Sequence, residues 1–265
     1  MSTLGDLFTT VLAREFAAAA ADDGVRVIAV TTTASLVAAL AARRLGTADL
    51  AIAPGFGTLD GAPRPALSLG ERAMRAGASP RGPVSDTFVA VARGLIGVVV
   101  TPGQLDSRGA TNLSHVAGTH AAPRVALPGS RGLPDHNDSP SRVWYLVPDH
   151  AARTLVDRVD FVSGSPPSPQ RTRRLITRLG VFTLDSHHGW KADCLFPEVR
   201  ADDVAASGGF PIRVAPGVPT VAHPTPAELD ALASVDPDDL RSIEFDGADG
   251  ARHAQRVVAR ERQSL

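Results

Sequence analysis

Residues 96–112 read IGVVVTPGQLDSRGATN. The run Ile96–Val100 is apolar and rich in β-branched side chains, and Pro102 follows it closely. A short, continuous apolar run of this kind is typical of a strand that is buried on both faces of a parallel sheet. The polar segment 103–112 therefore leaves the carboxyl end of a central strand, which is where open α/β sheets place their ligands.

A plain turn also accounts for the segment 103–112. Asp106 and Asn112 have side chains that commonly bond nearby backbone groups, and Gly103 and Gly109 permit positive φ angles. On spacing alone, the turn is favoured over a ligand site. Other stretches of the chain are needed to decide between the two.

The residues before this strand predict a βαβ unit. Apolar side chains recur at helical spacing in 4–20, and the apolar run 25–30 follows. A second helix is expected at 35–45 and a second strand at 49–53, which makes the two strands parallel. The predicted fold class is α/β, a single domain with a central, mostly parallel sheet flanked by helices.

Residues on both sides of the central strand predict further elements. Just before it, a helix is expected at 85–93, with Phe88, Val89 and Leu95 facing the core. Thr225, Pro226 and Glu228 form a good helix start, as N-cap, first turn and capping-box partner. Further strands are expected at 124–127, 142–147, 158–163, 173–183 and 211–214, with Trp190 and Lys191 on a loop.

No linker or repeat divides the chain, so residues 1–245 are assigned to the α/β domain. Residues 246–265 are charged and have few large apolar side chains, which predicts a frayed helix or a disordered tail. Residues 54–84 contain many Gly and Pro and little periodic pattern, which is typical of a mobile or functional loop.

The composition argues against several classes of protein, namely nucleic-acid-binding, disulfide-stabilised and membrane-spanning proteins. The chain has 265 residues and a net charge of −1, so no general basic surface indicates a nucleic-acid partner. Cys194 is the single cysteine, which excludes an intrachain disulfide and fits a reducing cytoplasm. No apolar run approaches the ~18 residues that a membrane span requires, so no membrane partner is expected.

Three stretches in order indicate a family. They are 103–112, then 127–137 (LPGSRGLPDHN), then 179–182 (LGVF). Together they resemble the β-type subunit of the class I coenzyme A transferases, and the resemblance spans roughly residues 10 to 245. The branch that they resemble most contains the small subunits of actinobacterial cholesterol ring-cleaving hydrolases and glutaconate-CoA-transferase-like β subunits. Segments 159–164, 209–211 and 224–229 also fit.

The resemblance implies an acyl-CoA enzyme made of two kinds of subunit. Family members usually carry a nucleophilic glutamate just after the second strand, but here that position holds Phe56 within the sequence PGFG. The resemblance then implies that a partner α-type subunit, in an α₂β₂ assembly, supplies the glutamate. Hydrolytic C–C ring cleavage of a cyclic diketone acyl-CoA is favoured. CoA transfer between carboxylic acids, a non-catalytic scaffold, or a homologue with a new reaction remain alternatives.

The same resemblance, with side-chain chemistry, selects the candidate residues. A preorganised Gln104 amide can donate to a developing oxyanion, while Asp106 orients the loop. Arg131 beside Gly132 suits a phosphate or carboxylate, although a surface arginine in a turn is an equal alternative. The candidates are Gln104 and Asp106 for catalysis, and Phe56, Gly103, Asn112, Arg131, Gly132 and Asn137 for binding of substrate or CoA.

No cofactor is expected beyond the CoA carried by the substrate. His187 and His188 are adjacent, so on an extended segment they point to opposite faces. The spacing His-x₃-His or Cys-x₂-Cys, which is common in metal sites, does not accompany them. The expected metal content is therefore none.

Overall fold

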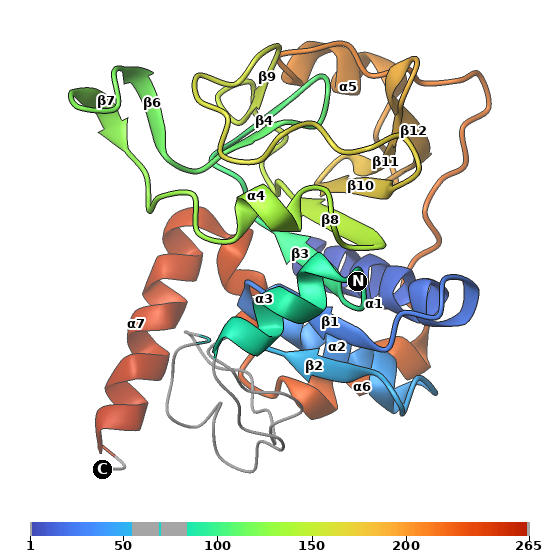
Figure 1. The fold of residues 1–265 in the computed structure, drawn as a ribbon. Coiled ribbons are helices and arrows are strands. Elements are labelled where there is room, and N and C mark those ends of the chain that lie inside the picture. Colours follow the sequence, from blue (N-terminus) through green and yellow to red (C-terminus); the bar gives the residue numbers. More distant parts are fainter. Residues whose placement is uncertain (1, 55–68, 70–83, 264–265) are drawn as a thin grey trace. The chain divides into compact units, whose positions relative to one another are not determined.

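The computed structural model describes residues 2–54, 69 and 84–263 (Figure 1). The chain divides into two compact units, one made of residues 1–86 and 223–265 and the other of residues 87–222. The first unit is discontinuous in sequence, which explains why no linker marks the division. Phe56 and most of the loop expected at 54–84 lie outside the described residues.

The first unit contains the predicted βαβ pattern. Strands β1 (Val27–Ala29) and β2 (Ala51–Ala53) are parallel, with Ile28 opposite Ile52. Its helices are α1 (Leu4–Asp22), α2 (Thr33–Arg44), α6 (Pro226–Val235), the 3₁₀ helix η2 (Leu240–Glu244) and α7 (Gly247–Gln263). Fully buried side chains of α1 and α2, such as Phe8, Phe16 and Leu36, form the core.

Local sequence sets where these helices begin. Thr225 accepts from the backbone N–H of Glu228, whose carboxylate accepts from the Thr225 N–H in return, which confirms the predicted capping box. Thr3 with Asp6 and Thr32 with Ser35 form the same motif at α1 and α2. The charged segment 246–265 is mostly helical, because α7 runs to Gln263.

The second unit is built on five strands in the order β12-β11-β10-β8-β3. Pairs β3–β8 and β8–β10 are parallel, whereas β10–β11 and β11–β12 are antiparallel. The strands are β3 (Gly97–Val100), β8 (Arg142–Leu146), β10 (Thr172–Thr177), β11 (Gly180–Asp185) and β12 (Gly189–Leu195). Every residue of β3 and β8 is buried, as expected for central strands, and the α/β class with mostly parallel strands is confirmed.

Smaller elements complete this unit. Strands β4 (Gln104–Asp106), β5 (Thr111–Asn112) and β9 (Leu155–Val156) form a three-stranded sheet, and β6 (His115–Gly118) with β7 (Pro123–Ala126) forms a hairpin that stands apart in Figure 1. The helices are α3 (Val84–Ala92), which begins at the boundary of the units, α4 (Leu133–His136) and α5 (Ala201–Ser207).

Several sequence-based expectations are wrong in this unit. Residues 173–183 are not one strand, because the chain turns between β10 and β11 and pairs with itself as a hairpin. Trp190 and Lys191 lie in strand β12 rather than on a loop. The segments 158–163 and 211–214 form no named strand, since their backbones make only isolated bridges or side-chain contacts.

The prediction of which residues at and just after α3 face the core is wrong. Phe88, Val89 and Leu95 are exposed, although their apolar character predicted that they would face the core. Val91 is fully buried instead. Periodicity identifies the helix but does not fix which side meets the sheet when apolar residues occur on more than one side.

None of the helices described in residues 2–54 and 84–263 is long and apolar enough to cross a membrane.

A buried histidine in the second unit predicts acid sensitivity. His150 is 1% exposed, its Nδ1 lies 2.8 Å from the Thr177 hydroxyl, and its Nε2 has no partner among the described residues. Burial lowers the pKa of His150 from 6.5 to about 4. Between these values the unfolded chain binds a proton that the folded chain does not. Stability is therefore full above about pH 6.5 and decreases by up to about 3 kcal/mol as the pH falls toward 4.

Urea unfolding at several pH values tests this expectation. His150→Asn should remove much of the slope between pH 7 and about 4, and asparagine tolerates the left-handed backbone found here (φ 47°). His120→Asn is the matched control, because His120 is exposed. An unchanged slope in His150→Asn would exclude this residue as the cause.

Candidate functional site

The predicted loop 103–112 is a tight β-hairpin closed by Asp106. Its Oδ1 accepts from the backbone N–H groups of Arg108 and Ala110, both at 2.9 Å. Its backbone carbonyl accepts from the buried Trp190 indole at 3.1 Å. Gly109 has φ 82°, and an added Cβ there would meet Leu184 at 2.7 Å. Asp106 thus shapes the turn, in the orienting role that its residue type predicts.

Gln104 lies on β4 and is buried in a hydrogen-bond network. Its Oε1 accepts from Asn112 Nδ2 at 2.7 Å and from the Asp160 backbone N–H at 3.0 Å. Its Nε2 donates to Asp160 Oδ2 at 3.2 Å, and the same oxygen accepts from the Ala117 N–H at 2.9 Å. Both ends of the Gln104 amide therefore have partners within the chain.

Asn112 completes this network from β5. Its Nδ2 also donates to the His115 carbonyl at 2.7 Å, and its Oδ1 accepts from the Ser114 N–H at 2.9 Å. Gly103 donates its N–H to the Asn112 carbonyl at 2.9 Å, and an added Cβ would meet Leu127 at 2.6 Å. These two residues hold the hairpin together with little room for a larger side chain at position 103.

Asn137 joins the second predicted loop to the first. Its Nδ2 donates to the carbonyls of Gly109, at 2.9 Å, and of Ser165. Its Oδ1 accepts from the Tyr145 hydroxyl at 2.8 Å. Burial raises the pKa of Tyr145, so the phenol stays protonated and able to donate. The structure thus brings the two loops into one buried network.

Arg131 and Gly132 lie at the edge of that network. Arg131 is exposed, has φ 49° and makes no hydrogen bond or ion pair with the described residues. Gly132 is buried, and an added Cβ would meet the His136 ring at 2.5 Å and Phe88 at 2.7 Å. Of the candidates that the structure describes, Arg131 alone presents a charged group to solvent.

Two residues of this region were missed as site candidates. Asp160 binds Gln104, and it sits in a segment that the family resemblance had marked without assigning it a role. Arg173 is fully buried and donates to the carbonyls of Asn137, Asp138, Pro140 and Thr172 at 2.9–3.3 Å. Nothing in the sequence distinguishes Arg173 from its neighbours Arg171 and Arg174.

A further unusual carboxyl group lies in the first unit. Burial raises the pKa of Glu244, while hydrogen bonds from the Ala34 backbone and the Thr32 side chain lower it in part. Its Oε1 lies 3.5 Å from the Ala34 N–H at the start of α2. A carboxylate at a helix N-terminus satisfies otherwise unpaired backbone donors, which is a structural role.

In the second unit, the two loops form one network of hydrogen bonds within the chain. The selected amide and carboxylate side chains of the two loops, Gln104, Asp106, Asn112 and Asn137, are used in internal hydrogen bonds. Among the described residues, no group of three or more His, Cys, Asp or Glu side chains is placed to hold a metal ion. What this region can offer a ligand is its shape, backbone dipoles and the exposed guanidinium groups of Arg108 and Arg131.

Replacing Gln104 tests whether its amide has a structural role in the hydrogen-bond network or a catalytic role. Gln104→Ala removes the acceptor of the buried Asn112 amide and of the Asp160 backbone N–H, so the free energy of unfolding should fall by about 2–3 kcal/mol. Urea unfolding measures it, with Arg108→Ala, at an exposed position of the same turn, as control. A variant that unfolds like the wild type but whose active complex loses about 10²–10³ in kcat would instead identify an oxyanion donor.

Comparisons with known sequences identify relatives. No protein-family model matches the chain. It is 33% identical over 175 residues to the cholesterol ring-cleaving hydrolase IpdB subunit of Rhodococcus jostii (strain RHA1), which covers 61% of this chain and 68% of that protein. It is 28% identical over 146 residues to one of the subunits of the 3-oxoadipate CoA-transferase of Pseudomonas knackmussii, which covers 50% of this chain and 55% of that protein.

Comparison with solved structures finds proteins with a similar fold. The decarboxylase AibA/AibB superposes with a TM-score of 0.80 at 27% identity, over 91% of this chain and 97% of the matched chain. Rhodococcus jostii RHA1 IpdAB superposes with a TM-score of 0.77 at 28% identity, again over 91% and 97%. The similarity therefore extends over nearly all of both chains, far beyond the three motifs.

Proposed function

Because the chain belongs to the CoA-transferase family as a β-type subunit, we propose that it acts with an α-type subunit on an acyl-CoA thioester. The favoured reaction is hydrolytic cleavage of a ring C–C bond in a cyclic diketone acyl-CoA. In this reaction water adds across the bond next to a ring ketone, which gives a carboxylate on one carbon and a C–H bond on the other. The partner subunit supplies the glutamate that acts as the base.

One observation carries this proposal. In the described part of both predicted loops, every carboxylate and amide selected from the sequence is engaged within the chain. The position that carries a glutamate in typical relatives holds Phe56. A chain whose two loops form a preformed hydrogen-bond network, with no free reacting group among the selected residues, is suited to shaping half of a shared site.

The identity to IpdB supports ring cleavage over simple CoA transfer. That relative is named as a subunit of a cholesterol ring-cleaving hydrolase, and it matches more of this chain than the transferase relative does. In this proposal, this chain positions the acyl-CoA and keeps water away from every bond except the one that reacts. Such positioning typically contributes several kcal/mol to catalysis.

Product analysis tests the reaction. The chain is co-expressed with an α-type subunit, and the purified complex is incubated with a panel of acyl-CoA esters, including cyclic diketones, in heavy-oxygen water. Ring cleavage gives a CoA product that has gained one water, with the heavy oxygen in a new carboxylate and no free thiol. Transfer of CoA to added acetate would overturn the ring-cleavage proposal, as would loss of CO₂ or release of free thiol.

The isolated chain is the essential control. The shared-site proposal requires that turnover by this chain alone is negligible beside that of the complex. It further requires that a glutamate-to-glutamine change in the partner abolishes turnover. Equal turnover by the isolated chain and the complex would refute it.

Arg131 gives a finer test of substrate binding. Arg131→Ala should mainly raise KM for the CoA ester in the active complex, since a charged hydrogen bond to phosphate or carboxylate contributes roughly 1.5–3 kcal/mol. Arg108→Ala, which removes an exposed arginine from the neighbouring turn, is the matched control. Unchanged KM in Arg131→Ala would leave Arg131 as an ordinary surface residue.

A further inference from the structure

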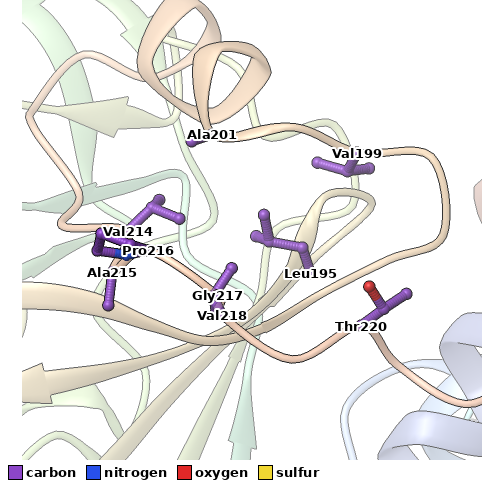
Figure 2. A pocket seen from close by; sticks show the side chains of 9 residues that line it. All are labelled: Leu195, Val199, Ala201, Val214, Ala215, Pro216, Gly217, Val218 and Thr220. Atoms are coloured by element: carbon purple, nitrogen blue, oxygen red, sulfur yellow. The ribbon is translucent and has the colours of Figure 1, made fainter.

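A hollow of about 380 Å³ lies beside β12, the outer strand of the five-stranded order (Figure 2). The segment after α5 bridges β12 twice, at Lys191 with Arg213 and at Leu195 with Thr220. Between these bridges, residues 192–194 of β12 face the longer stretch 214–219. The longer stretch bows away from the strand, and the hollow fills the space that it leaves.

The lining of this hollow is apolar. Figure 2 shows the side chains of Leu195, Val199, Val214 and Val218 around it. No charged side chain lines it, and Thr220 contributes the one side-chain hydroxyl. The hollow is open, and its volume is within the range of small-molecule sites.

A second hollow, of about 430 Å³, shares Val214 and Ala215 with the first. Its other lining residues are Lys191, Ala192 and Arg213. The two hollows therefore border the same short piece of chain, and two cationic side chains line the second.

The two cationic residues of the second hollow lie next to each other. Lys191 and Arg213 are direct partners in a parallel bridge, so their side chains leave the same face side by side. Both are exposed, and neither makes an ion pair or hydrogen bond through its side chain with the residues that the structure describes. Like charges directly opposite on neighbouring strands are destabilising, and no acidic residue lines either hollow to offset them.

We propose that the two hollows form one binding site for a molecule with an apolar chain and a carboxylate head, such as a medium-chain fatty acid. The chain lies against Leu195, Val214 and Val218, where it removes apolar surface from water. The carboxylate lies between Lys191 and Arg213, where it relieves their repulsion and accepts charge-assisted hydrogen bonds. The site does not depend on the proposed ring cleavage, because its lining shares no residue with the Gln104 network.

Calorimetric titration of the full chain tests the site, with octanoate as probe and octanol and acetate as partial probes. Octanoate should bind saturably and at least about tenfold more tightly than either, since one tenfold step corresponds to ~1.4 kcal/mol. The double variant Lys191→Gln with Arg213→Gln should weaken octanoate about tenfold and leave octanol unchanged. Arg124→Gln, an exposed arginine on β7, should change nothing.

A second variant tests the apolar end. Val218→Trp places a large ring in the hollow and should reduce the binding of both octanoate and octanol. Far-ultraviolet circular dichroism and urea unfolding establish that each variant is folded. Absence of saturable octanoate binding to the wild type would overturn the proposal. So would equal octanoate affinity in the wild type and the double variant, which would show that the two cations do not hold the carboxylate.

Discussion

Replacing Arg173 with methionine is expected to lower the free energy of unfolding by about 3–5 kcal/mol, because two or more charge-assisted hydrogen bonds are lost at roughly 1.5–3 kcal/mol each. Arg173 is fully buried, and its guanidinium donates to the carbonyls of Asn137 at 3.0 Å and Asp138 at 2.9 Å. Burial lowers the pKa of Arg173, but arginine remains charged at any ordinary pH. Methionine fills much of the space and leaves those carbonyls without a donor.

The same change should loosen the candidate site. Arg173 holds the Asn137 backbone, and Asn137 in turn donates to the Gly109 carbonyl of the first loop. In an active complex we therefore expect lower kcat/KM as well as lower stability. Arg171→Met, two residues earlier and exposed, is the matched control and should stay within about 0.5 kcal/mol of the wild type.

Arg173→Lys separates the charge from the hydrogen-bond geometry. Lysine keeps the charge but cannot reach several carbonyls in one plane, so an intermediate loss is expected. Urea unfolding followed by circular dichroism measures all three variants. A methionine variant as stable as the wild type would show that the buried guanidinium adds no net stability.

Replacing Arg241 with methionine is expected to cost a similar amount, about 3–5 kcal/mol, because it leaves buried carboxylates unpaired. Arg241 on η2 donates to Asp6 Oδ1 from Nε at 3.0 Å and from Nη2 at 2.7 Å, and to Asp236 Oδ2 from Nη1 at 3.0 Å. All three residues are buried. The cluster ties the C-terminal helices of the first unit to α1.

The pH dependence of this loss identifies its cause. Burial acts to raise the pKa of Asp6, but the Thr3 backbone N–H and Arg241 outweigh it and hold that pKa below its usual value. Without Arg241 the Asp6 pKa rises, and the carboxyl group can become neutral at mildly acidic pH. The difference in stability between the wild type and Arg241→Met should therefore be largest near neutral pH and shrink as the pH falls.

Arg252→Met provides the control for the Arg241 experiment. Arg252 pairs with Asp249 on the exposed side of α7, where an ion pair contributes between 0 and about 1 kcal/mol. Thermal unfolding should distinguish it clearly from Arg241→Met. Equal melting temperatures for the two variants would contradict the assignment of Arg241 as the residue that secures the C-terminal helices.

Features with local causes could be predicted from the sequence. The capping box of Thr225 and Glu228 and the apolar run of β3 depend on residues a few positions apart, and both occur as predicted. The parallel pairing of β1 with β2 follows from the length of the helix between them. The family was also readable, because three short motifs in order suffice where no single one does.

Tertiary structure alone decided which polar groups are available for chemistry. Gln104 looks like a free donor in the sequence, but its amide is held by Asp160, 56 residues away. Arg173 reaches Asn137 across 36 residues, and Arg241 reaches Asp6 across 235. Helix and strand patterns arise from interactions within a turn or two of chain, so sequence spacing reveals them. Long-range hydrogen-bond partners exist only after the core has packed, and burial then decides whether a side chain faces a ligand or another part of the same chain.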